Sequence, residues 1–591
     1  MDEISSVTVG GVSATILGYD ATTSSLQLDF NEDTLTPGTS YSAIVSYTQS
    51  GGSPTQINST NVHDVAPLHN ILLLIVDDWA IDSSPIDNSS AENPGTTYAP
   101  MPNLETLAAR GLRFTNAYAQ PVCSPTRATI LTGRYAFRHT VGWPAGATLP
   151  TSELTLPEIF TAQSSSYQLA SFGKWHLGGG NNGPLNLGGW TEFAGILGGV
   201  ANSYTDWNKT VNGVTTNNVT TYTTTDQVND AVSFIETITT NPWFVWIGFN
   251  APHSPFHNPP TTSPALEDYP DYATTDGAVT GTDRRFAYEA ALQALDTEIG
   301  RLLDSVDLAT TNIIIIGDNG TPTPVVQAPY TSTHAKGTLY DGGIHVPLVM
   351  AGPDVPTIGT SHKLVHCVDL FATILDLAGI DTASATAAVD TIDSQSLVPI
   401  LIGQDSATRY IVSEVFGSGG NGDGRTILSS DHPDYKLIIF GDPTSSSDTS
   451  TYEMYHIAVD QNEQTPLTIP AVLGDAHYHA YQALIAKDIE LSPALDIGDT
   501  LYLHLNETSG PASVPQNLNL APSAIVVDGV AATFIDRVDQ TDSTQRYWVK
   551  CTVPDTISAP YSTATVTFSN VANGNSTRVF TVADTEIFVA P

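Results

Sequence analysis

Four oxygen-bearing side chains follow two strongly apolar segments of this 591-residue chain, and they are Asp77, Asp78, Asp318 and Asn319. Continuous apolar runs are typical of buried parallel strands, and ligands bind beyond the carboxyl ends of such strands. A lone Asp-Asp pair is more often a loop or a helix cap. Three carboxylates at one place, however, would repel one another unless a cation joined them. Because every ligand is an oxygen atom, the set favours Ca²⁺ or Mg²⁺ over Zn²⁺.

Basic residues are scarce, with 20 Lys and Arg against 61 Asp and Glu, so those near predicted strand ends are informative. Four bases follow such ends or lie in Gly-rich turns, and they are Lys174, His176, His253 and Lys336. A divalent cation and several basic side chains beside a nucleophile can bind a tetrahedral oxyanion ester and stabilise the charge that develops when the nucleophile attacks it. The concentration of bases therefore predicts an anion pocket.

A candidate nucleophile, Cys123, lies just ahead of a short predicted helix. Ser124 suits the N-cap of that helix, Pro125 its first position and Gly133 the residue after its end. The N–H groups of such a helix start favour an anion, and Arg127 follows one turn later. A lone cysteine at a helix start more often serves packing, so the neighbouring residues must decide.

The pentapeptide Cys-Ser-Pro-Thr-Arg at 123–127 resembles the Cys-x-Pro-x-Arg motif of type I sulfatases, in the alkaline-phosphatase superfamily. Leu-Thr-Gly-Arg at 131–134 is similar to the extension of that motif, and Gly-Lys-Trp-His-Leu-Gly at 173–178 to the family's second motif. The other candidate residues occur in the family's order. The resemblance covers about 67–465 and includes Tyr-Glu-Met-Tyr at 452–455.

The resemblance implies that a formylglycine-generating enzyme converts Cys123 to Cα-formylglycine. Its hydrate would attack sulfur, expel the alcohol and release sulfate by collapsing back to the aldehyde. A thiol would form a stable adduct, whereas a gem-diol can break its own ester.

The resemblance also implies a role for each of the other candidates. One Ca²⁺ would be held by Asp77, Asp78, Asp318 and Asn319. Arg127 would orient the formylglycine, and His176 would help to deprotonate the sulfated intermediate. Lys174, His253 and Lys336 would bind sulfate, with a His or a Lys protonating the leaving oxygen.

The chain departs from the family's pattern at a few positions outside these roles. Trp-Ala-Ile-Asp at 79–82 follows Asp78 where relatives often have a small Gly-containing stretch, and Asp341 and His345 stand where relatives often carry Glu and Arg. His139 is a candidate either for the mouth of the site or for a structural role. Five tryptophans in predicted loops could stack on sugar rings, although core packing is the commoner role: Trp79, Trp143, Trp175, Trp190 and Trp207.

We predict an α/β protein with an alkaline-phosphatase-like, mostly parallel sheet flanked by helices. Apolar strands alternate with helical patterns in its middle, such as the stripe Tyr288, Leu292, Leu295, Ile299 and Leu302. The predicted parts are an incomplete β-sandwich-like module (1–66), the catalytic α/β domain (67–404), a smaller α+β subdomain ending in a helix around 475–488 (405–488) and a second β-sandwich module (489–591).

The two terminal modules resemble each other, since 7–15 aligns with 525–533. Their short alternating segments between Gly, Ser and Thr turns predict immunoglobulin-like sandwiches. The first copy lacks the leading part of the second, which would leave a sheet edge unpaired. We therefore hypothesise that it takes a strand from elsewhere in the chain or from another chain, so that the modules support self-association or assembly.

The composition narrows the partners and the location. A formal charge of −41 argues against nucleic acid and anionic membranes. No apolar run reaches the roughly 18 residues of a membrane span, and three cysteines cannot form a disulfide framework. The first residues show no signal peptide. We expect an extracellular or periplasmic protein, or alternatively one associated with a virion or a cell surface.

The leading functional prediction is a sulfuric ester hydrolase acting on a sulfated carbohydrate. One alternative is a phosphonate or phosphodiester hydrolase of the same superfamily. Another is a structural component of a virion or surface assembly that carries a sulfatase domain. A third, an inactive sulfatase kept for binding, is disfavoured because the motif set is complete.

Overall fold

The computed structural model describes residues 68–491, apart from short gaps, together with the strands of two terminal sheets. The gaps are 88–95, 97, 164, 261–282, 390, 418–421, 442–450 and 470–476. The chain divides into two compact units, residues 1–70 with 377–379 and residues 71–376 with 380–591.

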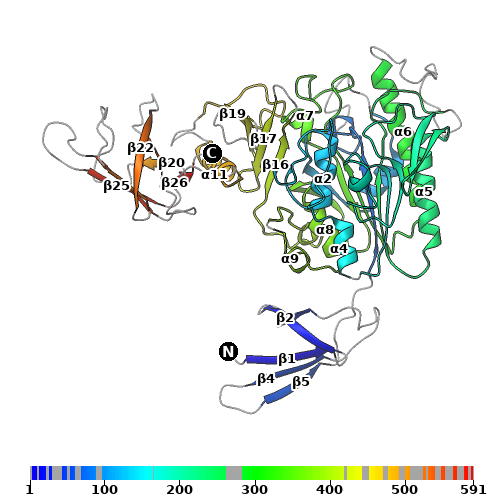
Figure 1. The fold of residues 1–591 in the computed structure, drawn as a ribbon, viewed down its shortest axis with the longest axis horizontal. Coiled ribbons are helices and arrows are strands. Elements are labelled where there is room, and N and C mark those ends of the chain that lie inside the picture. The colour runs from blue at the N-terminus through cyan, green and yellow to red at the C-terminus, as the bar shows by residue number, and fades with distance from the viewer. Residues whose placement is uncertain are drawn as a thin grey trace. The chain divides into compact units, whose positions relative to one another are not determined.

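A ten-stranded mixed sheet forms the centre of the larger unit (Figure 1), in the order β11-β10-β9-β8-β12-β6-β13-β14-β7-β15. Its strands are β6 (Asn70–Val76), β7 (Leu112–Tyr118), β8 (Gln168–Lys174), β9 (Glu192–Ile196), β10 (Trp207–Val211), β11 (Val214–Val219), β12 (Trp243–Gly248), β13 (Thr311–Gly317), β14 (Leu348–Ala351) and β15 (Gly359–His366). The neighbours β9, β8, β12 and β6 are parallel. Their carboxyl ends therefore lie at one edge of the sheet, which confirms the predicted mostly parallel architecture.

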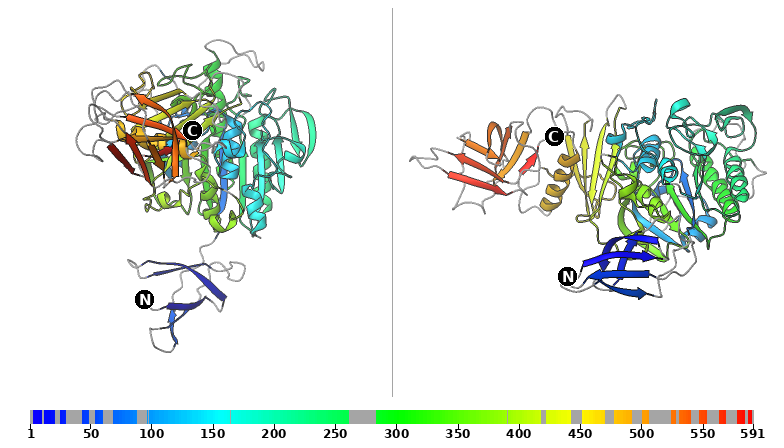
Figure 2. Two further views of the ribbon diagram at one scale, coloured as in Figure 1. Left: turned by 60° about the vertical axis from the view of Figure 1, so that its left-hand side comes forward. Right: turned by 60° about the horizontal axis from the view of Figure 1, so that its bottom comes forward.

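Helices cover both faces of this sheet (Figures 1 and 2). On one face α1 (Pro102–Ala108), α5 (Thr223–Thr237) and α6 (Asp283–Leu303) pack against one another and the strands. On the other, Phe160 of α4 (Leu156–Ala162) stacks on Phe244 of β12. The remaining helices of the larger unit are α2 (Cys123–Thr132), α3 (Ala136–His139), α7 (Asp341–Ile344), α8 (Asp369–Leu377), α9 (Thr382–Ala385), α10 (Val398–Leu401) and α11 (Tyr478–Leu491), with 3₁₀ turns η2 (Ile81–Ser83) and η3 (Gly180–Asn182). Among the described helices, none is both long and apolar enough to cross a membrane.

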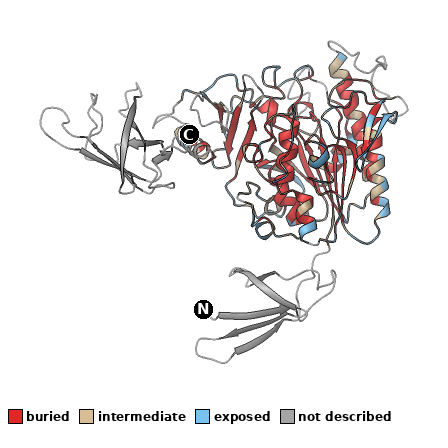
Figure 3. Cartoon of the chain, viewed as in Figure 1, coloured by how far each residue is buried: buried red, intermediate tan, exposed pale blue. Residues whose placement is uncertain are grey.

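The apolar pattern explains how the sheet is held between its helices. Alternate residues of β6 join the same core cluster as α6, because successive side chains of a strand point to opposite faces. The predicted helical stripe lies on α6 and is fully buried there: Tyr288, Leu292, Leu295, Ile299 and Leu302. Figure 3 shows the central strands and the inner faces of the helices as buried.

A smaller antiparallel sheet follows in the chain, in the order β16-β17-β18-β19. Its strands are β16 (Tyr410–Val415), β17 (Gly424–Ser429), β18 (Tyr435–Phe440) and β19 (Thr451–His456). Helix α11 packs against β17 and β18. This arrangement agrees with the predicted α+β subdomain, and the helix expected around 475–488 spans Tyr478–Leu491.

Both terminal segments form antiparallel sheets. The first has the order β3-β2-β1-β4-β5, and the second β25-β24-β21-β22-β23-β20-β26. The strands are β1 (Glu3–Val9), β2 (Val12–Asp20), β3 (Ser25–Asp29), β4 (Ala43–Thr48), β5 (Pro54–Ser59), β20 (Thr500–Leu505), β21 (Ala524–Val527), β22 (Val530–Asp539), β23 (Tyr547–Thr552), β24 (Thr563–Phe568), β25 (Arg578–Ala583) and β26 (Ile587–Val589).

The aligned segments of the two termini are hairpins with one shared register. Val7 lies opposite Ala14 in the first, and Ile525 lies opposite Ala532 in the second. These are equivalent positions in the sequence alignment, so the backbone pairing agrees with an internal repeat. The immunoglobulin-like assignment and the boundaries after 66, 404 and 488 stay predictions.

Candidate active site

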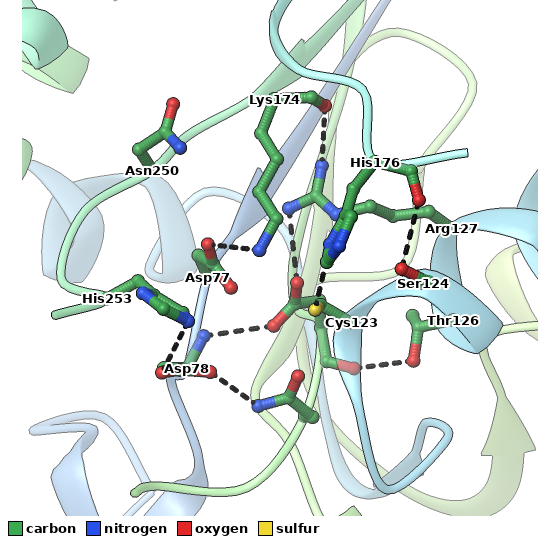
Figure 4. A network of polar contacts seen from close by, with 12 residues as sticks. Asp77, Asp78, Cys123, Ser124, Thr126, Arg127, Lys174, His176, Asn250 and His253 are labelled. Carbon is green, nitrogen blue, oxygen red and sulfur yellow. Dashed lines mark hydrogen bonds and ion pairs between the residues drawn. The ribbon is translucent and has the colours of Figure 1, made fainter. Parts of the chain in front are cut away.

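The oxygen-bearing side chains that follow β6 and β13 lie together. Figure 4 shows Asp77 and Asp78 of this group beside Lys174 and His253. The Asp78 N–H donates to Asp318 Oδ1 at 2.9 Å, and Asn319 Nδ2 donates to Asp78 Oδ1 at 2.8 Å. Asp77, Asp318 and Asn319 are fully buried, and Asp78 nearly so. The two strand ends thus form one acidic cluster at the carboxyl edge of the sheet.

Each carboxylate of this cluster has a cationic partner. The pairs are Asp77 with Lys174, Asp318 with Arg127 and Asp78 with Lys336. Lys174 Nζ lies 2.7 Å from Asp77 Oδ2, and Arg127 Nη2 lies 3.1 Å from Asp318 Oδ2. The three acidic and three basic groups balance formally, although buried charges repay their desolvation only when their remaining polar atoms are also satisfied.

Two buried oxygen atoms of the cluster are not satisfied. Asp77 Oδ1 and Asn319 Oδ1 accept no hydrogen bond from the described residues. Burial raises the pKa of Asp77 to about 8, although Lys174 acts against this shift. Asp77, Asp78 and His253 also bring one ligand atom each within 4.8 Å of one another. Buried polar atoms are normally paired, so the donor set fits a divalent cation that prefers oxygen ligands.

The candidate nucleophile is the first residue of α2. This helix begins at Cys123 with Val122 as its N-cap, and Gly133 ends it in the left-handed region, as predicted. The predicted N-cap role of Ser124 is wrong, because its hydroxyl instead donates to the carbonyl oxygen of His176 at 2.9 Å. Cys123 Sγ lies 3.3 Å from His176 Nδ1. The tie between α2 and the segment after β8 therefore holds these two side chains together.

Arg127 anchors α2 to two strand ends at once. Besides its ion pair, it donates through Nη1 to the carbonyl oxygen of Lys174 at 2.9 Å. A Cβ atom at Gly248 would lie 2.4 Å from this same nitrogen, so the end of β12 needs glycine there. Thr126 Oγ1 adds a bond of 2.6 Å to the carbonyl oxygen of Asp318. The start of the helix is thereby fixed over the acidic cluster.

Both histidines of the site favour the neutral form. Burial and then the charges of Lys174 and Arg127 lower the pKa of His176 far below its usual value. Burial also lowers the pKa of His253 to about 4, although Asp78 opposes this. Burial raises the pKa of the Cys123 thiol, so the unmodified side chain is a poor nucleophile near neutral pH.

The basic side chains of the site differ in how far they are buried. The Lys174 side chain is fully buried, whereas those of His253 and Lys336 are 15% and 19% exposed. Lys336 is held by its own N–H, which donates to Thr321, and by Gly337, whose N–H donates to the Pro121 carbonyl beside α2. Lys174 therefore lies at the floor of the site, and His253 and Lys336 lie nearer its mouth.

Two tyrosines position the site and were not predicted for it. The Tyr288 hydroxyl donates to the Asp78 carbonyl at 2.7 Å. The Tyr204 hydroxyl donates to the carbonyls of Asn250 and His253 at 2.6 and 2.8 Å. We predicted Tyr288 as a core residue because its spacing matches the helical stripe. That spacing does not indicate that its hydroxyl also donates a hydrogen bond to the backbone.

The structure brings every predicted site residue into one network of contacts: Asp77, Asp78, Cys123, Arg127, Lys174, His176, His253, Asp318, Asn319 and Lys336. His139 is fully buried and bonds Thr129 and the Val141 N–H, which is the structural role. Of the five tryptophans proposed for stacking, four are buried: Trp79, Trp175, Trp190 and Trp207. Trp143 is partly exposed.

Comparison with known proteins identifies relatives over this region. A family model described as Sulfatase matches residues 69–380. Arylsulfatase A of Bos taurus is 28% identical over 422 residues, which is 66% of this chain and 78% of the relative. N-acetylgalactosamine-6-sulfatase of Homo sapiens is 30% identical over 377 residues, 56% of this chain and 66% of the relative. This chain thus spans about two thirds of the second relative's length.

The fold also matches solved structures. The structure of BT4656 in complex with its substrate D-glucosamine-2-N,6-O-disulfate has a TM-score of 0.54 and 19% identity. The match covers 71% of this chain and 97% of that chain. It shows a common fold over the matched part of the chain.

Proposed function

This chain belongs to the sulfatase family, whose members are sulfuric ester hydrolases, and we propose that its active site is the network around Cys123 and that its substrate is a sulfated carbohydrate. The observation that carries the proposal is a pair of buried oxygen atoms, Asp77 Oδ1 and Asn319 Oδ1, which have no hydrogen-bond partner within the described part of the chain and lie beside a cysteine at a helix start.

The proposed site needs two groups besides the unmodified side chains: a calcium ion and a formylglycine made from Cys123. Asp77, Asp78, Asp318 and Asn319 would hold one Ca²⁺, which as a Lewis acid would polarise a sulfate oxygen. Cys123 would be converted to formylglycine, whose hydrate supplies an oxygen nucleophile together with a second hydroxyl that lets the enzyme break its own ester.

The side chains of this protein divide the remaining work. Lys174, charged and fully buried, binds sulfate at the floor, where few waters compete with it. Arg127 fixes the helix start and hence the orientation of residue 123. Neutral His176 has Nδ1 3.3 Å from the Sγ position, where an oxygen of the converted residue would lie, and accepts a proton there.

The alcohol leaves towards the mouth of the site. His253 and Lys336 both contact Asp78 and are the partly exposed bases of the network. They hold the outer sulfate oxygens, and one of them delivers the proton that the departing sugar oxygen requires. The names of two relatives support a carbohydrate as substrate, since one acts on N-acetylgalactosamine 6-sulfate and one on a sulfated glucosamine.

The test is turnover by full-length protein made together with a formylglycine-generating enzyme and supplied with Ca²⁺. Mass spectrometry of the Cys123 peptide first establishes the converted fraction. We expect hydrolysis of 4-nitrophenyl sulfate to exceed that of an aryl phosphodiester by at least about 100-fold, a difference of about 2.7 kcal/mol in transition-state binding. The reverse preference would support the phosphonate or phosphodiester alternative, and Cys123→Ala is the inactive control.

A further inference from the structure

A cavity of about 300 Å³ is lined by the end of β9, the loop that follows it and the start of β10. It is lined by ten residues, including Val200, Asn202, Asp206 and Asn208. Strand β9 is the parallel neighbour of β8 in the sheet, with Ile196 opposite Lys174. Because neighbouring strands are about 4.8 Å apart, this loop leaves the sheet one strand away from the sulfate-binding lysine.

The loop is in direct contact with the catalytic histidine. Ile196 and Leu197, which line the cavity, accept the N–H groups of Trp175 and His176 at 2.9 and 3.1 Å. A Cβ atom added to Gly199 would lie 2.2 Å from the His176 ring, so the backbone of the loop rests on the imidazole. The loop that lines the cavity therefore also supports the histidine beside Cys123.

The other end of the loop is tied to the second histidine. Tyr204 is fully buried and donates to the carbonyls of Asn250 and His253. Its own carbonyl accepts the N–H of Thr223 at the start of α5. The cavity wall is thus fixed between both histidines of the site, which suits a subsite for the group that leaves from sulfur.

The lining suits an uncharged sugar ring. Asn202 and Asn208 offer amide donors and acceptors for hydroxyl groups, and Val200 offers an apolar surface for a C–H face. Asp206 is the one formally charged residue among the ten that line the cavity, and it is exposed. The adjacent Lys209 is engaged by Asp226 and Asp230 at 2.5 and 2.7 Å. A second sulfate or a carboxylate would therefore meet a carboxylate and no free cation in this lining.

Resting on the proposed sulfatase function, we propose that this cavity binds the leaving sugar and selects one that is neutral apart from the sulfate being removed. Its volume lies at the small end of ligand pockets, so it takes a single ring. Lys174 and Lys336, the lysines of this region, lie at the acidic cluster, where sulfate would bind. The cavity lining instead offers polar groups that can bind sugar hydroxyls. The preferred substrate class is a singly sulfated neutral saccharide.

The first test compares kcat/KM of converted, Ca²⁺-loaded protein across a defined panel. The panel holds 4-nitrophenyl sulfate, neutral hexoses and N-acetylhexosamines with one sulfate at each position, and the same sugars with two sulfates. We expect the best substrate to be singly sulfated and about tenfold better than its disulfated form. A disulfated sugar as the best substrate overturns the inference, and so does a panel with no sugar better than the aryl sulfate.

The second test uses Asn208→Ala, which should lower the ratio of sugar-sulfate to aryl-sulfate kcat/KM about tenfold. Asn217→Ala is the matched control, because this exposed asparagine of β11 lies outside the lining and should leave both values unchanged. An unchanged ratio in Asn208→Ala, in a protein that still hydrolyses the aryl sulfate, overturns this inference alone. Failure of fully converted wild-type protein to hydrolyse the aryl sulfate overturns the proposed function and this inference with it.

Discussion

Two buried charge clusters of the larger unit both combine carboxylates with basic side chains, and they differ in how completely their polar atoms are paired. The first is the acidic cluster of Asp77, Asp78, Asp318 and Asn319 with its bases. The second, called here the Lys436 network, comprises Lys436, Asp341, Glu463 and His345. Lys436 Nζ lies 2.9 Å from Asp341 Oδ1 and 2.5 Å from Glu463 Oε1.

Every carboxylate oxygen of the Lys436 network accepts a hydrogen bond or contacts a basic group, although the contact of Glu463 Oε1 with Lys436 is an ion pair without hydrogen-bond geometry. Glu463 Oε2 accepts the Asp341 N–H at 2.6 Å, and Asp341 Oδ2 lies 3.3 Å from His345 Nδ1. In the acidic cluster Asp77 Oδ1 and Asn319 Oδ1 have neither a hydrogen bond nor an ion pair among the described residues. The comparison teaches that burial of charge alone does not indicate function. Oxygen atoms with neither a hydrogen bond nor an ion pair distinguish the acidic cluster from the Lys436 network.

The largest expected effect is on activity, from a change in the acidic cluster. Asp318→Asn keeps the shape of the side chain but removes a charge that bonds Asp78 and pairs with Arg127. We expect turnover of 4-nitrophenyl sulfate by the converted protein to fall on the order of 10³-fold. Asp431→Asn, an exposed change after β17, is the control. Retention of even a tenth of the activity in Asp318→Asn would place the reaction elsewhere.

The next effect is on stability, from a change in the Lys436 network. Lys436→Met leaves two buried carboxylates without their cation, so the free energy of unfolding should fall by about 3–5 kcal/mol. Denaturant unfolding measures this change, and activity per folded molecule should fall far less than in Asp318→Asn. Lys363→Met removes a lysine whose side chain is half exposed and should cost less than about 1 kcal/mol. Equal costs for the two lysines would refute the distinction.

A third effect separates the clusters by their response to metal. Ca²⁺ at 100 times its Kd should stabilise chelator-treated protein by about 2.7 kcal/mol, seen as a higher Tm. Asp77→Asn should lose most of this shift, whereas Glu463→Gln should retain it despite a lower starting Tm. A Tm that rises equally in both variants would mean that the metal binds outside the acidic cluster.

The fourth effect concerns acid sensitivity, which comes from two buried histidines outside both clusters. Burial lowers the pKa of His139 and of His366 to about 3. Each is neutral when folded but takes up a proton near pH 6.5 when unfolded. Stability is therefore full above pH 6.5 and falls as the pH drops towards 3, by up to about 1.4 kcal/mol per pH unit for each group. His139→Gln should flatten the decline of Tm between pH 6.5 and 4.5, and an unaltered slope would contradict this explanation.

The central fold and the candidate site were largely predictable, because both depend on strong local patterns. Apolar runs ending in polar residues identified β6, β8, β12 and β13, and parallel strands bring such ends to one edge. The scarcity of basic residues made the bases that follow these strands conspicuous.

Contacts between distant polar groups could not be predicted in this way. Ser124 is a residue type that often caps helices, but its hydroxyl donates a hydrogen bond to the carbonyl of His176. Only folding brings that carbonyl close to it. The Tyr204 hydroxyl and the Lys436 network likewise depend on partners far away in sequence. Such pairing is set by tertiary geometry, which composition and periodicity do not encode.

The measurement that tests the account most directly is aryl sulfate turnover as a function of the converted fraction at Cys123, in protein loaded with Ca²⁺. Samples made with increasing amounts of the converting enzyme provide the series, and mass spectrometry supplies the fraction. The account predicts activity proportional to conversion, reaching zero for the unmodified thiol. Activity that is independent of conversion, or fully converted protein that is inert towards sulfate esters, would contradict it.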